Sequence, residues 1–106
     1  MTLELNGFNI SGLGDSETGC GGSGTANEFG IDVNAQRAVV IRGPGVVRRF
    51  RNQGIRLLNS TGVTVTGVTT STNCFSGIFV TGGSDHVLEG NVSVRNGNLT
   101  NPCGGI

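Results

Sequence analysis

Residues 54–57 read Gly54-Ile55-Arg56-Leu57, and residues 63–68 read Val63-Thr64-Val65-Thr66-Gly67-Val68. This stretch decides the fold, because in both parts apolar residues alternate with polar ones. Alternation at every second residue is the pattern of a β-strand that buries one face. Glycine, which tolerates positive φ, stands at the start of the first part and near the end of the second. The sequence therefore predicts two short strands that a turn separates.

The same two parts recur along the chain at a nearly constant interval. The dipeptide Gly-Ile occurs at residues 30–31, 54–55, 77–78 and 105–106, so successive copies are 24, 23 and 28 residues apart. The second part, apolar-x-apolar-x-Gly, ends at Gly7, Gly43, Gly67 and Gly90. Each of the last three glycines lies 13 residues after the glycine of a Gly-Ile pair. A repeat of this length is typical of solenoids, whose units stack to bury apolar faces that one unit cannot cover.

Stacking would place equivalent residues above one another at the usual strand spacing of about 4.8 Å. Three inward columns are expected: Leu5, Ile41, Val65 and Leu88; Ile31, Ile55, Ile78 and Ile106; and Val33, Leu57 and Val80. His86 falls in the column of Val39 and Val63, so either its side chain points inward or the strand slips and Val87 points inward. Residues 1–106 are expected to form a single all-β solenoid domain of about four coils.

The composition agrees with a turn-rich β protein and excludes several kinds of function. The chain has 20 glycines among 106 residues, no Trp or Tyr, and a net charge of zero. All seven basic residues are arginine, which excludes Schiff-base chemistry on lysine. A neutral chain has no electrostatic bias toward nucleic acid or anionic membranes, so neither is expected as a partner. No apolar run reaches about 18 residues, so no membrane span is expected.

Residues 11–29 interrupt the repeat with an irregular, glycine-rich loop. Insertions in repeat proteins often carry function. Asp15, Glu17 and Glu28 offer oxygen ligands for Ca²⁺, but their spacing matches no known calcium loop, and a solvated loop is the simpler explanation. We expect no required cofactor and no metal site.

Both ends of the chain have strand patterns without a capping segment. Repeat arrays normally carry polar caps, and open strand edges pair with other strands. We therefore expect a fragment of a larger protein, or a module that associates end to end through its open edges.

The pattern Gly-Ile-x-Val followed by Val-x-Val-x-Gly-Val, as in residues 54–68, resembles the coil repeat of right-handed parallel β-helices. The resemblance is to pectate-lyase-like and NosD-like β-helix proteins, and it covers nearly the whole chain except the loop at 11–29. It implies a right-handed parallel β-helix from an extracellular, periplasmic or cell-surface protein that binds or processes polysaccharide. If the chain is part of an enzyme, the resemblance implies a polysaccharide lyase or a glycoside hydrolase. The alternative is a non-catalytic structural or adhesive shaft, because this fold hosts many activities.

One outward column has the chemistry of a sugar-binding strip. Asp32, Arg56 and Phe79 occupy equivalent positions beside the Gly-Ile pairs. Sugar-active β-helices, which this chain resembles, often bind substrate along such an outer face. A carboxylate, a bidentate donor and an apolar plate suit this role. The alternative is a surface ion pair between Asp32 and Arg56, with Arg56 lying against Phe79, that stabilises the ladder by about 0.5 kcal/mol.

A second candidate is the basic turn formed by Arg48, Arg49 and Arg51, with Phe50 among them. Such a turn can hold an acidic polysaccharide by charge and bidentate geometry. The resemblance to lyases, which use an Arg or Lys base near bound Ca²⁺, makes it the best single location for chemistry. A solvated turn explains it as well. The short motifs of polygalacturonases and pectate lyases are absent, so no catalytic residue is assigned.

The chain has three cysteines. Cys74 and Cys103 both stand just before a Gly-Ile pair, on successive coils, where equivalent positions come within about 5 Å of each other. We therefore predict a Cys74–Cys103 disulfide, which would imply an oxidising compartment. The alternative is three free thiols.

Overall fold

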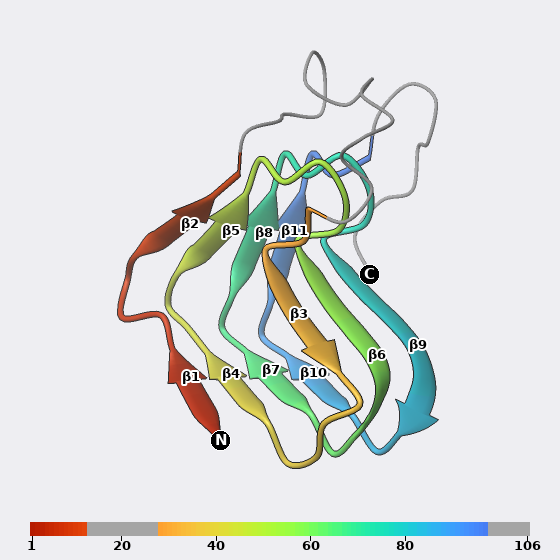
Figure 1. Cartoon of the computed structure of the whole chain (residues 1–106). Coiled ribbons are helices and arrows are strands. Elements are labelled where there is room, and N and C mark those ends of the chain that lie inside the picture. Colours follow the sequence, from red (N-terminus) through yellow and green to blue (C-terminus); the bar gives the residue numbers. More distant parts are fainter. Residues whose placement is uncertain (13–27, 98–106) are drawn as a thin grey trace.

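The computed structural model describes residues 1–12 and 28–97, and every regular element in these ranges is a β-strand (Figure 1). The strands form three parallel sheets. Sheet A contains β1 (Thr2–Glu4), β4 (Val40–Arg42), β7 (Thr64–Thr66) and β10 (Val87–Glu89). Sheet B contains β2 (Asn9–Ser11), β5 (Val46–Arg48), β8 (Thr69–Ser71) and β11 (Val92–Val94). Sheet C contains β3 (Ile31–Asn34), β6 (Ile55–Thr61) and β9 (Ile78–Ser84).

The chain visits the sheets in a fixed order, A, B and C, and then returns to sheet A. We call one such passage a coil: coil 1 contains β1 to β3, coil 2 contains β4 to β6, coil 3 contains β7 to β9, and coil 4 contains β10 and β11. Each strand pairs in parallel with its equivalent in the next coil, so equivalent strands lie side by side in Figure 1. The prediction of an all-β chain with stacked parallel strands is confirmed, and the arrangement is compatible with a parallel β-helix.

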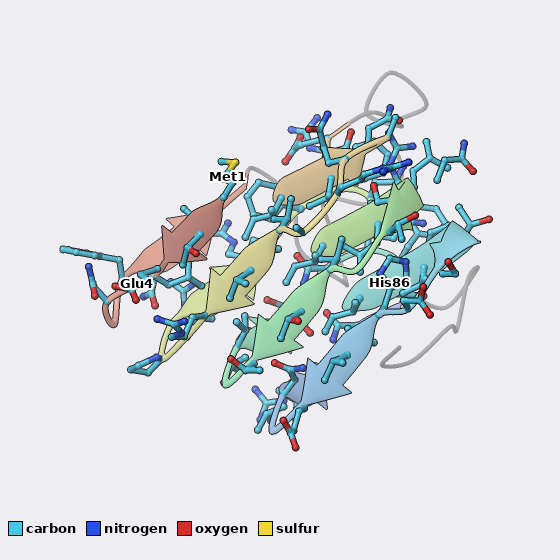
Figure 2. The ribbon with its side chains drawn as sticks, turned by 90° about the horizontal axis from the view of Figure 1, so that it is seen from below. Met1, Glu4 and His86 are labelled. Atoms are coloured by element: carbon cyan, nitrogen blue, oxygen red, sulfur yellow. The ribbon has the colours of Figure 1, made fainter. Side chains whose placement is uncertain are left out.

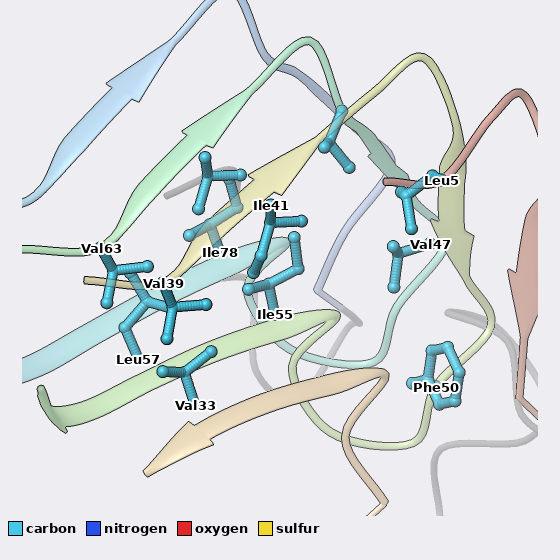
Figure 3. Close-up of a cluster of buried hydrophobic side chains, with 12 residues drawn as sticks. Leu5, Val33, Val39, Ile41, Val47, Phe50, Ile55, Leu57, Val63 and Ile78 are labelled. Atoms are coloured by element: carbon cyan, nitrogen blue, oxygen red, sulfur yellow. The ribbon is translucent and has the colours of Figure 1, made fainter. Parts of the chain in front are cut away.

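Inward side chains of the three sheets form one apolar core (Figure 3). Ile31, Ile55 and Ile78 pair in register, and so do Val33, Leu57 and Val80, as predicted. The prediction that Val80 is a core residue is wrong, because its side chain is 39% exposed in the last described strand of sheet C. Ile106 lies outside the described residues. The side chains of Ile55, Leu57 and Ile78 are fully buried. Burying one such aliphatic side chain contributes about 1.5–3 kcal/mol, so these columns hold the coils together.

The first predicted column is wrong in coil 1. Leu3, and not Leu5, pairs with Ile41, and the column continues through Val65 and Leu88. Four residues separate β1 from β2, whereas two separate β7 from β8, so alignment on the glycine after the strand misplaces β1 by two residues. A shift of two residues keeps the same strand face inward. Leu5 is therefore still buried, although it lies beyond the end of β1.

The glycines of the Gly-Ile pairs stand where the backbone has no room for a side chain. A Cβ on Gly30 would lie 2.5 Å from the carbonyl oxygen of Gly54, and a Cβ on Gly54 would lie 2.8 Å from that of Gly77. A Cβ on Gly77 would overlap the Thr70 hydroxyl of the facing sheet B. At Gly30 and Gly54 glycine is therefore required by the close approach of the next coil, and at Gly77 it is required by the contact with Thr70 of the same coil.

Turns at the corners of the stack place residues with positive φ above one another. The corner between sheets B and C repeats this conformation at Arg49, Thr72 and Arg95, with φ of 62°, 51° and 56°. Side chains with a Cβ adopt this left-handed region at a cost of roughly 1–2 kcal/mol, and asparagine tolerates it better than a β-branched residue. Each of these residues therefore stores local strain that the stacking of the coils imposes.

Thr72→Asn is expected to stabilise the chain by about 0.5–1 kcal/mol, because asparagine relieves part of this strain. The measurement is the midpoint of urea unfolding. Thr61→Asn, in the regular strand β6, is the control and is expected to give no gain. An equal effect of the two substitutions would show that the φ of Thr72 does not limit stability.

Side chains at the corners tie coil 3 to coil 2 and coil 4 to coil 3. Asn73, Asn91 and Asn96 each accept a hydrogen bond from the backbone N–H of the residue 23 positions earlier and donate one to the carbonyl 26 positions earlier. We call such a side chain a corner clamp. His86 occupies the fourth such position, and its Nδ1 accepts from the backbone N–H of Val63. Of the two alternatives for His86, the inward orientation is confirmed, and Val87 is exposed.

The connection from β2 to β3 is longer than its equivalents in coils 2 and 3. β2 ends at Ser11 and β3 begins at Ile31, whereas β6 begins at Ile55 after β5 ends at Arg48. The predicted irregular loop, residues 11–29, falls in this connection, and its residues 13–27 lie outside the described part of the chain.

Candidate functional site

Sheet C carries the predicted polar and aromatic strip on its outward face. Asp32 of β3 pairs in register with Arg56 of β6, which pairs with Phe79 of β9. Parallel pairing in register places all three side chains on one face, one above the other. Phe79 is 37% exposed, so its ring is available to a ligand.

Asp32 and Arg56 form a bidentate ion pair, as predicted. Nε of Arg56 donates to Oδ1 of Asp32 at 2.9 Å, and Nη2 donates to Oδ2 at 2.8 Å. This parallel geometry is the strongest form of an arginine–carboxylate contact. The hydrogen bond to Asp32 raises the pKa of Arg56, so the guanidinium stays protonated across the physiological range. The side chain of Asp32 is 35% exposed and that of Arg56 is 22% exposed, so solvent still reaches the pair.

Phe29 completes the strip and was not identified from the sequence. The guanidinium carbon of Arg56 lies 4.0 Å from the centroid of the Phe29 ring, which is a cation–π distance. The cation–π contact predicted for Phe79 is made by Phe29. Phe29 precedes Gly30 and lies outside the strand repeat, so period-2 patterning carried no signal for it. Its position directly before a Gly-Ile pair was the available clue.

The chemistry of the strip suits binding better than catalysis. The Arg56 guanidinium stays protonated at neutral pH and so cannot act as a base, and each oxygen of the Asp32 carboxylate accepts one hydrogen bond from it, with lone pairs left for a ligand. The two hydrogen bonds use Nε and one proton of Nη2, so Nη1 has donors to offer to a hydroxyl or carboxylate. The strip therefore combines directed donors and acceptors with an exposed phenyl ring.

The side chains of the predicted basic turn lie in different surroundings. Arg48 lies on the outward face of sheet B, where its Nε donates to the hydroxyl of Ser11 at 3.3 Å. Phe50 points into the core and is 8% exposed (Figure 3). Nε of Arg51 lies 3.6 Å from a carboxylate oxygen of Glu28. Arg49 is exposed, at a turn with φ of 62°. These arginines do not point to one common site, so the turn is a weaker candidate than the strip.

The predicted calcium ligands and disulfide are only partly within the described residues. Asp15 and Glu17 lie outside them, and Glu28 pairs with Arg51. Among residues 1–12 and 28–97, no three His, Cys, Asp or Glu side chains come together as metal ligands would. Cys74 is buried and disulfide-bonded. Its predicted partner Cys103, like Cys20, lies outside the described residues, so this pairing stays a prediction.

An open pocket lies at the coil 1 end of the core, between sheets A and C. It has a volume of about 400 Å³, and Met1, Leu3, Ile31 and Ile41 contribute its apolar lining. Figure 2 shows Met1 and Glu4 at this end of the stack, with His86 toward the other end. The pocket is the exposed end of the core columns, and Asp32 is the one residue that it shares with the strip.

No protein-family model, curated protein or solved structure matches this chain. Within the described part of the chain, no helix is long and apolar enough to cross a membrane.

Proposed function

We propose that this chain belongs to a right-handed parallel β-helix protein of the pectate-lyase-like or NosD-like kind, and that the outward strip of sheet C binds polysaccharide. The strip consists of Phe29, Asp32, Arg56 and Phe79. Such a module acts in an extracellular, periplasmic or cell-surface location, where polysaccharides are met.

The observation that carries this proposal is the bidentate pair of Asp32 and Arg56, in register with the exposed Phe79. Sugar rings present hydroxyl groups at their edges and C–H groups on their faces. A planar ion pair offers acceptors and donors to the hydroxyls, while a phenyl ring covers the C–H face. Because Asp32, Arg56 and Phe79 stand on paired strands, their backbone positions are fixed before a ligand arrives, which reduces the entropy lost on binding.

Binding without catalysis is the form of this function that the geometry favours. Glycoside hydrolysis uses two carboxyl groups about 5–10 Å apart, one of which must act as an acid. On the strip, Asp32 is the single carboxylate, and its two oxygens are held by Arg56. The strip is therefore proposed as a binding surface.

The test is a screen of oligosaccharides, neutral and uronic, followed by calorimetry with the best binder. Phe79→Ala is expected to weaken binding by about three- to tenfold, because a stacked aromatic ring contributes about 0.5–1.5 kcal/mol. Phe8→Ala is the matched control, since Phe8 is an exposed phenylalanine in the turn between β1 and β2 and is distant in the fold from sheet C. It is expected to leave the affinity unchanged.

Equal losses in the two variants would place the ligand elsewhere, and no binding to any oligosaccharide would reject the proposal. Circular dichroism of both variants shows whether either substitution disturbs the sheets.

The second candidate is a structural or adhesive shaft that binds no sugar and associates end to end. The corner clamps favour it, since they repeat the same coil-to-coil contact at several corners. Failure of the oligosaccharide screen, together with concentration-dependent growth of the particle in analytical ultracentrifugation, would support the shaft.

A further inference from the structure

Coil 4 is clamped to coil 3 at three corners, and one of the three clamps carries an ionisable group. Asn91 accepts from the N–H of Val68 at 3.0 Å, and Asn96 accepts from the N–H of Asn73 at 3.1 Å. At the corner between sheets C and A, Nδ1 of His86 accepts from the N–H of Val63 at 3.2 Å. An amide oxygen accepts this bond at any pH, whereas an imidazole accepts it only when neutral.

The surroundings of His86 suit the neutral ring. Because Nδ1 is an acceptor, the single proton of the ring is on Nε2. Nε2 is buried and has no hydrogen-bond partner within the part of the chain that the structure describes. Val63, which donates to Nδ1, is fully buried. Protonation would place a second donor against the N–H of Val63 and a positive charge next to the core.

We propose that His86 makes the attachment of coil 4 sensitive to pH: protonation of its Nδ1 breaks the clamp to Val63 and loosens coil 4 from coil 3. Imidazole is the side chain whose ordinary titration falls between pH 5 and 8. The nearby charged groups are Asp85 and Arg37. Asp85 precedes His86 and accepts from the hydroxyl of Ser84 at 3.3 Å. Arg37 forms an isolated β-bridge with Thr61, and Thr61 pairs with Ser84 in the next coil.

This device is independent of what the strip of sheet C binds. We expect coil 4 to open locally at the His86 corner, because the amide oxygens of Asn91 and Asn96 still accept their hydrogen bonds in acid. The coil 4 strands β10 and β11 would therefore lose protection before β4 to β6 do. A protein that meets an acidic compartment would expose the edges of coil 3 in this way, and those edges pair readily with other strands.

The test compares the intact chain with His86→Asn, which introduces at this corner the asparagine clamp found at the other two corners. Between pH 8 and pH 5, the melting temperature of the wild type is expected to fall by about 5–10 °C more than that of His86→Asn. Asn91→His is the converse variant and is expected to add a second acid-sensitive corner, with a further fall. A difference between wild type and His86→Asn that stays constant over this range would overturn the proposal.

Amide hydrogen exchange gives a local readout that does not depend on global unfolding. The N–H of Val63 is bonded to His86, and the N–H of Val68 is bonded to Asn91 with otherwise similar geometry. The protection factor of Val63 is expected to fall at least about tenfold relative to that of Val68 between pH 8 and pH 5. A constant ratio of the two protection factors would count against a titrating clamp.

Discussion

Gly83→Ala is expected to lower the free energy of unfolding by about 2–5 kcal/mol. Gly83 pairs with Ser60 in sheet C and has a φ of +77°, a left-handed conformation that alanine adopts at a cost of roughly 1–2 kcal/mol. A Cβ at this position would also overlap the carbonyl oxygen of Ser60 and lie 2.8 Å from its carbonyl carbon. Both are backbone atoms, so relief requires strands β6 and β9 to move apart, and such overpacking costs a further 1–3 kcal/mol or so.

Gly7→Ala separates the two causes. Gly7 has the same φ of +77°, but a Cβ there would have no atom within 4 Å. It is therefore expected to cost only the backbone term, roughly 1–2 kcal/mol. Urea unfolding of the two variants, followed by circular dichroism, measures the difference. If Gly83→Ala proved no more harmful than Gly7→Ala, the close contact between β6 and β9 at this point would be refuted.

Asn73→Ala is expected to cost about 2–4 kcal/mol. Asn73 is fully buried, and its side chain accepts from the N–H of Phe50 at 3.0 Å and donates to the carbonyl of Val47 at 3.2 Å. Alanine leaves both buried backbone groups without these partners, and an unsatisfied buried group costs about 1–3 kcal/mol. The substitution also removes the hydrogen bond from Nδ2 to Asn96, so the clamp of coil 4 loses part of its support.

Asn34→Ala is the matched control, because Asn34 is exposed at the end of β3. An exposed substitution of this kind usually changes stability by less than about 0.5 kcal/mol. The measurement is again the unfolding free energy in urea. Similar small losses in both variants would mean that water or a backbone shift replaces the bonds of Asn73, and that the corner clamps contribute little to the stack.

Much of the fold follows from local pattern. Alternation identified the inward faces of β3 and β6 and the buried Ile78 of β9, and the spacing of the Gly-Ile pairs identified the register of these strands. The pairing of Asp32 with Arg56 followed from the same register. These predictions succeeded because equivalent residues of successive coils pair with each other in a stacked parallel sheet. A nearly constant interval of 23 or 24 residues therefore identifies which residues are in contact.

The failures share a cause, which is variation in turns. Leu5 was assigned the place of Leu3 because the turn after β1 is longer than those after β7 and β10. Phe50, which stands between Arg49 and Arg51, enters the core, and no alternation in the sequence indicated this. Turn length and side-chain direction at corners depend on the coil below, and no periodic pattern carries that information.

Local patterns in the sequence were enough to predict short parallel strands with one buried and one exposed face. Period-2 alternation and the spacing of glycine can be recognised within a short stretch, whatever that stretch packs against. Three contacts required the folded structure. Phe29 covers the Arg56 guanidinium, and Asn73 accepts a hydrogen bond from Phe50 of the preceding coil. Nδ1 of His86 accepts a hydrogen bond from the N–H of Val63. These contacts join residues of different coils or fall outside the strand repeat. They depend on the direction of a side chain at a corner, which is set by packing of the coils and not by the residue sequence of one turn.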